Sequence, residues 1–375
     1  MGQAKFLRAF FYYKLVRYFG GVPLYLHEVK SAEQAFLPRA TVDAVYEQII
    51  SDAKYAITNL APPAQFPQSG EATRGSATIL LADVYMTRKE YAEAEKLLKT
   101  LPDMGYDLFD NYADAFATEN KNGKESLFEI QYRQGLQGGQ QSNFIYKFIP
   151  RSKNTKIVTG VATDNSSLGG WNMPTQDLIA DYEAGDLRKA ASIAIAEGTY
   201  DASYMFTYTA NTEIDDYVPT EGVEGVPYIK KYLHPHTDSN NTDDNWPIYR
   251  YAEALLFWAE AINEQPGRSA DALPYLNKVR ERAGLDEVTE TDQARLREII
   301  LHERRVELAF ENKRWHDLVR SGKAVEVMNA YGNRLKQQYS YLVEAAYRVD
   351  GHHLLYPLPF DEVEMNDLLE QNPGY

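Results

Sequence analysis

The stretch that most constrains the fold is residues 303–320, which read ERRVELAFENKRWHDLVR. Val306 and Phe310 are four residues apart on one apolar face, a spacing that predicts an amphipathic helix. Residues 312–313 interrupt the pattern, and a second helix over 314–319 is expected to end at the Ser-Gly pair that follows it. The stretch therefore predicts two helices joined by a tight turn.

A repeat signature predicts further helix pairs. Residues 76–101 show the spacing of a tetratricopeptide repeat, whose period is about 34 residues. The positions that carry this spacing are Ala82, Tyr85, Tyr91, Ala94 and Leu98. A weaker copy spans residues 251–279. Helices are also expected over residues 4–19, as a core helix, and over 38–60, with Thr41 as the N-cap.

Residues 109–247 differ from the rest of the chain because Gly, Asn, Thr, Ser, Gln and Tyr dominate them. Periodicity persists in a strand-like alternation over 126–132 and in a short helix over 175–183. A structureless loop of this length is unusual in a compact domain. We interpret the region as an insertion of long loops and short hairpins over the helical scaffold, where binding surfaces are commonly placed.

These patterns predict a mostly α-helical fold. Tetratricopeptide-like helix pairs would form an α–α superhelix scaffold, and the loop-rich insertion would contain short strands. We expect an N-terminal helical region over 1–108, the insertion over 109–247 as the ligand surface, and a C-terminal region over 248–375. The three regions are expected to pack as one structural unit.

Composition narrows the classes of partner. The net charge of −15 argues against nucleic acid and anionic lipid, which both select basic surfaces. The chain has no cysteine, so it has no disulfide, thiolate metal site or cysteine nucleophile. No apolar run approaches the about 20 residues of a membrane-spanning helix.

The usual catalytic and metal-binding motifs are missing. The helical zinc motif that His302 could begin needs a second histidine four residues later, where Val306 stands. The histidine pairs at 234/236 and 352/353 are too close in sequence to chelate a metal without further partners. There is no G-x-S-x-G elbow, phosphate loop or dinucleotide glycine pattern. We therefore expect no catalytic residue, no metal and no cofactor.

Three glutamates raise the question of a glycosidase, which needs two carboxylates. Glu303, Glu307 and Glu311 belong to a helical pattern that also contains Arg304 and Arg305. We predict that they form structural ion pairs, with opposite charges meeting along the helix surface.

Four motifs, in order along the chain, resemble the SusD/RagB family. The run ERR-x-E-L-x-F-E followed by RW-x-D-L-V-R in residues 303–320 is similar to the signature segment of that family. Residues 5–24 (KFLRAFFYYKLVRYFGGVPL), 250–263 (RYAEALLFWAEAIN) and the terminal 371–375 (QNPGY) also match its pattern. The resemblance covers essentially the whole chain in register.

The resemblance implies a nutrient-binding lipoprotein of the Gram-negative outer membrane. Such a protein captures an oligosaccharide or polysaccharide at the cell surface, without chemistry of its own, and delivers it to a SusC-like TonB-dependent transporter. The family's signal peptide, lipidated cysteine and first helices would precede this chain, and that cysteine would provide the only membrane attachment. Alternatives are peptide capture, as in the RagB branch, and a tetratricopeptide interaction scaffold.

Aromatic side chains beside Asn, Gln, Asp and Arg suit sugar rings, which have an apolar face and a rim of hydroxyls. The ligand-binding candidates are Trp171, Asn172, Trp246, Tyr146 and Tyr204. Trp171 with Asn172 leads this set, and its structural alternative is a cap on the helix that begins at Thr175. Trp246, Tyr146 and Tyr204 are more readily explained by packing.

Overall fold

The computed structural model describes residues 1–135 and 138–375, except for the side chains of residues 32 and 33. Contacts divide the chain into two compact units. Unit 1 comprises Met1–Ala61, Ala72–Glu90 and Lys313–Tyr375, and unit 2 comprises Pro62–Glu71 and Tyr91–Asn312. In the described residues, no helix combines the length and apolar character needed to cross a membrane.

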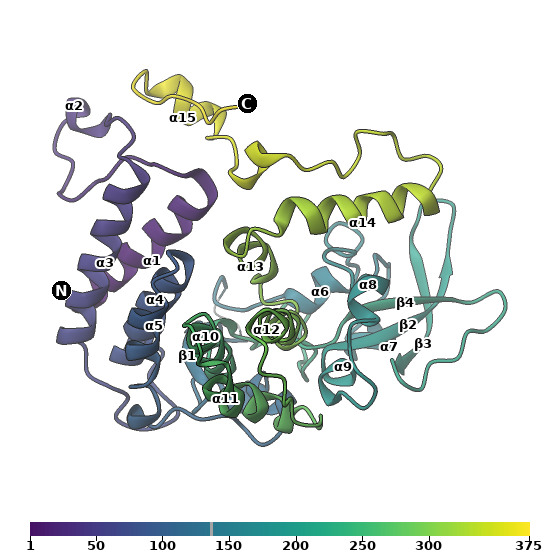
Figure 1. Cartoon of the computed structure of the whole chain (residues 1–375). Coiled ribbons are helices and arrows are strands. Elements are labelled where there is room, and N and C mark those ends of the chain that lie inside the picture. Colours follow the sequence, from purple (N-terminus) through teal and green to yellow (C-terminus); the bar gives the residue numbers. More distant parts are fainter. Residues whose placement is uncertain (136–137) are drawn as a thin grey trace. The chain divides into compact units, whose positions relative to one another are not determined.

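Unit 1 is helical (Figure 1). Its elements are α1 (Gly2–Phe19), α2 (Ala32–Ala35), α3 (Val42–Asn59), α4 (Arg74–Thr87), α13 (Arg314–Arg320), α14 (Ala324–Gln338), the 3₁₀ helix η4 (Gly351–Leu354) and α15 (Phe360–Met365). Helix α3 packs against both α1 and α4. The predicted N-cap of α3 is confirmed, because the Thr41 hydroxyl accepts a hydrogen bond from the Ala44 N–H at 3.2 Å.

Helix α1 was expected to be a core helix, and one face of it is. Phe6 and Tyr13 are fully buried, whereas Leu7, Phe11 and Leu15 are exposed. Because apolar residues occur all around this helix, the sequence pattern did not show which face would be covered.

Unit 2 combines helices with two small antiparallel sheets. Its helices are α5 (Tyr91–Leu98), α6 (Phe144–Phe148), α7 (Lys156–Thr159), α8 (Gln176–Ile179), α9 (Leu187–Ser192), α10 (Tyr251–Asn263), α11 (Ser269–Arg282) and α12 (Gln293–Glu307). Three 3₁₀ helices, η1 (Pro102–Met104), η2 (Tyr112–Ala115) and η3 (Thr118–Asn120), complete the helical elements. Helix α10 packs against α5, α11 and α12, and the three helices α10, α11 and α12 lie together in Figure 1.

The strands of unit 2 lie within the predicted insertion or next to it. They are β1 (Ser126–Ile130), β2 (Ile193–Tyr200), β3 (Phe206–Glu213), β4 (Glu224–Ile229) and β5 (Trp246–Arg250). β1 pairs with β5, and the second sheet has the order β3-β2-β4. The β2–β3 register shifts at Gly198, where a side chain would collide with the Thr207 carbonyl oxygen at 2.0 Å.

The predicted fold class is confirmed, whereas several element boundaries were wrong. Helices α4 and α5 occupy the first predicted repeat, and α10 packs with α11 in the second. The helix expected over 175–183 covers only Gln176–Ile179, and α12 ends at Glu307, before Phe310, whose φ is +68°. The three-region division stays a prediction, since the two units follow contacts and the regions follow sequence character.

Candidate functional site

Trp171 is an exposed aromatic side chain on a polar loop of unit 2. Its side chain is 58% exposed, and Asn172 beside it is exposed as well. Asn172 has a φ of +51°, a left-handed conformation that asparagine tolerates better than most residues. The cap of the following helix is Thr175, whose hydroxyl accepts a hydrogen bond from the Leu178 N–H at 3.3 Å. Because Thr175 caps this helix, the cap does not explain the exposed indole.

The loop that carries Trp171 is fixed to the end of α6. The N–H groups of Trp171 and Gly170 donate to the carbonyls of Lys147 and Ile149, each at 2.8 Å. Asn165 is fully buried, and its side-chain amide donates to the Tyr146 carbonyl at 2.9 Å. The loop therefore supplies donors to carbonyls at the C-terminal end of the helix, which would otherwise lack partners. Trp171 is exposed on a backbone that is held in place.

Tyr204 lies in the turn between β2 and β3 and is 77% exposed. The Asp201 carboxylate accepts hydrogen bonds from the N–H groups of Ser203 at 2.7 Å and Met205 at 3.0 Å, which shapes the turn. Tyr204 itself has a φ of +56°. An ordered turn thus presents a second exposed aromatic ring.

One segment anchors both aromatic residues. The Trp171 N–H donates to Lys147, and the Phe206 N–H, two residues after Tyr204, donates to the Arg151 carbonyl at 2.7 Å. Lys147 and Arg151 are four residues apart, so their Cα atoms are at most about 14 Å apart. Arg151, whose carbonyl is the second anchoring point, has an exposed side chain. This surface, defined by Trp171, Asn172, Arg151 and Tyr204, is called the aromatic surface below.

The structure does not bring the other two candidates to this surface. Tyr146 is fully buried, and its hydroxyl is 2.8 Å from Nε2 of His236. Trp246 is partly buried, stacks on Tyr232 with ring centroids 5.2 Å apart, and meets Phe144 edge-on at 5.1 Å. Tyr146 therefore has no exposed face for a ligand, whereas Trp246 uses its ring to pack on Tyr232 and Phe144 and is only partly exposed.

The signature glutamates belong to a buried ion network. Arg250 contacts three carboxylates: Glu311 through Nε at 2.8 Å, Glu125 through Nη1 at 2.6 Å and Glu307 through Nη1 at 3.0 Å. Glu307 also forms an ion pair with Arg282, whose Nη2 lies 2.6 Å from the Glu307 carboxylate. All of these side chains are at most 3% exposed. They cannot reach a glycan in this structure, so they do not form the carboxylate pair of a glycosidase.

The predicted structural ion pairs are confirmed, but they join α12 to other elements and do not run along its surface. Glu303 is buried and pairs with Arg188 of α9 and with Arg280 of α11, the latter at 2.9 Å. Arg305 contacts Asp177 at 2.7 Å. A four-residue spacing places two glutamates on one face of a helix, and this face is turned inward toward other elements.

The network sets the ionisation of its members. Burial alone would raise the pKa of Glu307, but Arg282, Arg250 and Arg188 outweigh it and lower that pKa to about 2. Burial lowers the pKa of Lys231 to about 8, although its ammonium lies 2.9 Å from Glu311. These side chains are at most 3% exposed, so we attribute their shifted pKa values to the packing of the fold.

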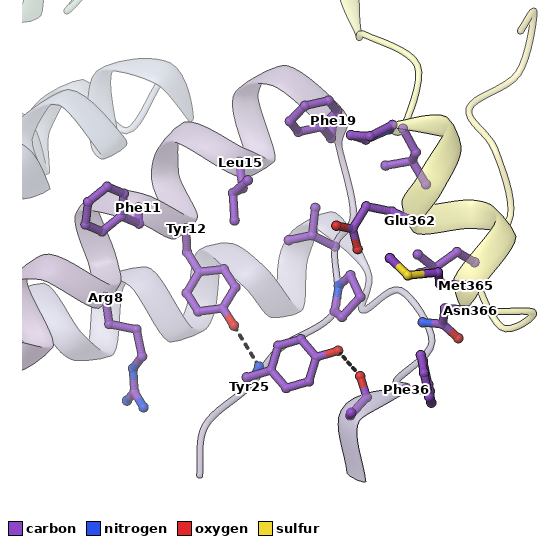
Figure 2. Close-up of a pocket in the computed structure, with 16 residues that line it drawn as sticks. Arg8, Phe11, Tyr12, Leu15, Phe19, Tyr25, Phe36, Glu362, Met365 and Asn366 are labelled. Atoms are coloured by element: carbon purple, nitrogen blue, oxygen red, sulfur yellow. Dashed lines mark hydrogen bonds between the residues drawn. The ribbon is translucent and has the colours of Figure 1, made fainter. Parts of the chain in front are cut away.

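Unit 1 contains an apolar pocket of about 410 Å³ (Figure 2). Phe11 and Leu15 of α1 and Met365 of α15 are among its lining residues. Tyr25 also lines it and is held by two hydrogen bonds, from its N–H to the Tyr12 hydroxyl at 2.7 Å and from its hydroxyl to the Ala35 carbonyl at 2.6 Å. The lining suits an aliphatic or aromatic group better than a sugar, whose hydroxyls need polar partners.

Comparisons with known proteins agree with this architecture. A model of the SusD family matches residues 124–375, and a second family model, described as starch-binding associating with outer membrane, matches residues 1–86. SusD-like protein P2 of Formosa agariphila is 33% identical, with all of this chain and 73% of that protein aligned.

Two solved structures are similar along the whole chain. A SusD-like protein from Bacteroides fragilis has a TM-score of 0.76 at 26% identity, and the alignment covers 100% of this chain and 79% of that protein's chain. A laminarin-binding SusD-like protein has a TM-score of 0.75 at 26% identity, and the alignment covers 100% of this chain and 78% of that protein's chain. With the matched family model and the ordered motifs of the sequence, these similarities show that the chain belongs to the SusD family.

Proposed function

We propose that the protein captures an oligosaccharide or polysaccharide on the aromatic surface. The observation that carries the proposal is the exposed indole of Trp171 on a loop fixed by backbone hydrogen bonds. A flat apolar ring held in place can stack on the C–H face of a sugar with little loss of rotamer entropy. Asn172 and Arg151 are exposed beside it and offer polar groups to the sugar hydroxyls.

The proposed capture involves no chemistry. Stacking and hydrogen bonding to a fixed surface retain a glycan without a general acid or nucleophile, and the signature glutamates are buried in ion pairs. The similar laminarin-binding SusD-like protein supports a glycan as the ligand class.

We further propose delivery to a SusC-like TonB-dependent transporter at the cell surface. The family model described as associating with the outer membrane supports this location. Attachment would run through a lipidated cysteine upstream of the residues present here, as the family resemblance implies.

A binding screen tests the proposal. The chain would be run in affinity electrophoresis against laminarin and other soluble polysaccharides, followed by calorimetry with Trp171→Ala alongside. We expect saturable binding of one glycan, no release of shorter sugars, and weaker binding by the variant. Breakdown of the bound glycan would contradict non-catalytic capture, and full binding by a folded variant would contradict the assigned surface.

Peptide capture is the second candidate, and the apolar pocket of unit 1 favours it. This pocket could hold an apolar side chain of a peptide, and its size lies in the range of small-ligand sites. Peptides in the same screen, with Phe11→Ala as the matched variant, distinguish the two ligands. Peptide binding that depends on Phe11 and not on Trp171 would favour this second function.

A further inference from the structure

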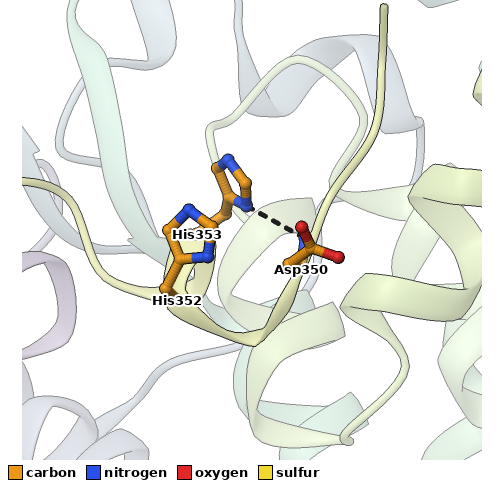
Figure 3. A group of neighbouring side chains, drawn as sticks. All are labelled: Asp350, His352 and His353. Carbon is orange, nitrogen blue, oxygen red and sulfur yellow. Dashed lines mark hydrogen bonds between the residues drawn. The ribbon is translucent and has the colours of Figure 1, made fainter. Parts of the chain in front are cut away.

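The turn between α14 and α15 brings together three side chains that carry metal-binding atoms. Asp350, His352 and His353 each offer one ligand atom, and these atoms all lie within 4.8 Å of one another (Figure 3). All three residues are partly buried. The two histidines were predicted to need a further partner, and the fold supplies it in Asp350, two residues before the first histidine.

The 3₁₀ helix η4 positions the carboxylate of Asp350 next to His353. In a 3₁₀ helix side chains three residues apart align, which brings Asp350 and His353 together. The ring of His352 then lies against that of His353, with centroids 3.8 Å apart and planes at 37°. Asp350 is the N-cap residue, and its carboxylate accepts a hydrogen bond from the His353 N–H. The cap therefore holds the carboxylate beside the rings before any ligand arrives.

We propose that this turn, defined by Asp350, His352 and His353, is a binding site for a divalent transition-metal ion of the zinc class. Two imidazoles and one carboxylate form a donor set that suits zinc, nickel or copper, whereas calcium and magnesium prefer oxygen ligands alone. In a tetrahedral zinc site the ligand atoms lie about 3.4 Å apart, because each metal–ligand bond is about 2.1 Å long. The observed ligand atoms lie within 4.8 Å of one another, so side-chain rotations must bring them closer by up to about 1.4 Å.

Two local interactions compete with the metal. The Asp350 N–H donates to Nδ1 of His353 at 2.9 Å, so a metal on that nitrogen replaces this hydrogen bond. Arg348 lies 3.6 Å from the Asp350 carboxylate and is largely exposed, so it can turn away into solvent. A site made of three protein ligands leaves a position for water or another small ligand.

A bound ion would also stiffen the end of the chain. The His352 ring meets Tyr375 edge-on at 5.4 Å, and the Tyr375 hydroxyl donates to the Leu355 carbonyl at 2.8 Å. Any side chain at Gly374 would lie 2.8 Å from the His352 ring. Gly374 and Tyr375 therefore pack directly on His352, a proposed metal ligand. A metal ion that holds the His352 ring in place would also restrict the motion of these last residues. This inference does not depend on the glycan proposal.

Calorimetry with tag-free, chelator-treated protein tests the site. We expect zinc chloride to bind at one equivalent, and calcium and magnesium chloride to give no saturable signal. His352→Phe keeps the ring that packs on Tyr375 and removes its nitrogens, and Asp350→Asn keeps an N-cap and removes the charge. Each variant should weaken zinc binding at least tenfold while its thermal unfolding without metal stays close to that of the parent chain.

His27→Ala is the matched control, because His27 is an exposed histidine of the same unit outside this turn. It should bind zinc like the parent chain. Absence of one-equivalent zinc binding would overturn the proposal, as would parent-like binding by both His352→Phe and Asp350→Asn. Loss of binding in His27→Ala alone would place the metal elsewhere and would overturn it too.

Discussion

Trp171→Ala removes the side chain on which the glycan proposal depends, and the structure sets the size of the effect. A tryptophan has up to about 250 Å² of surface, so an indole that is 58% exposed leaves about 140 Å² open. A sugar ring on one face would cover about half of this area. At about 25 cal/mol per Å², the contact contributes about 1.8 kcal/mol. We therefore expect the Kd for the glycan to rise about 20-fold.

Calorimetry with laminarihexaose, or with an oligosaccharide of whichever glycan binds in the screen, measures this change. Because the indole is mostly outside the core, the free energy of unfolding should fall by less than about 1 kcal/mol. Trp171→Phe keeps an apolar plate and should recover most of the affinity. An unchanged Kd in a folded Trp171→Ala variant would refute the reasoning. A loss of affinity matched by an equal loss of stability would show that the indole is structural.

Three further variants probe the ligand surface and the interior. Tyr204→Ala should weaken glycan binding several-fold in calorimetry, whereas Tyr341→Ala, whose side chain is equally exposed at 77% in unit 1, should leave the Kd unchanged. Glu307→Gln should lower the free energy of unfolding in urea by about 3–5 kcal/mol at pH 7, because it leaves buried guanidinium groups underpaired. The pKa of Glu307 is lowered to about 2, so the stabilisation by its carboxylate is complete above about pH 4.5 and is lost as the pH falls toward 2. Glu307→Gln should therefore make the free energy of unfolding less dependent on pH in this range. Burial lowers the pKa of His316 to about 3, so its neutral form stabilises the fold above about pH 6.5 and this contribution falls between pH 6.5 and 3. His316→Phe should reduce the slope in that range, and an unchanged slope would contradict the assignment.

Helices were predictable because their signals are local. Thr41 with the apolar residues that follow it specifies where α3 begins, and the structure confirms that cap. The strands of the β3-β2-β4 sheet were missed as individual elements. The short turn that joins β2 to β3 was not recognised, and β4 pairs with β2 across β3, which intervenes in the sequence, a pairing that no local signal specifies.

The candidate site was only partly predictable, because exposure depends on distant contacts. Tyr146 and Tyr204 both lie in the polar insertion, yet one is fully buried and the other 77% exposed. What separates them is His236 and the loop at Asn165, which pack around Tyr146. The partner of the histidines at 352/353 was missed for a different reason. Asp350 is close in sequence, but its carboxylate lies beside His353 only because Asp350 caps η4, a 3₁₀ helix in which residues three apart align.

The buried ion network and the loop that carries the proposed glycan surface both belong to unit 2. A guanidinium such as that of Arg250 has donors in a fixed plane, and here it meets Glu125, Glu307 and Glu311 together. Another packing of unit 2 would have to satisfy the same buried charges, so we infer that the network favours one arrangement of this unit. When the elements of unit 2 pack in a single way, the loops attached to them are also held in a single conformation. Backbone hydrogen bonds attach the loop of Trp171 to unit 2 in this way. A glycan that meets such a preformed surface does not have to order it, so even a few stacking and polar contacts can give useful affinity.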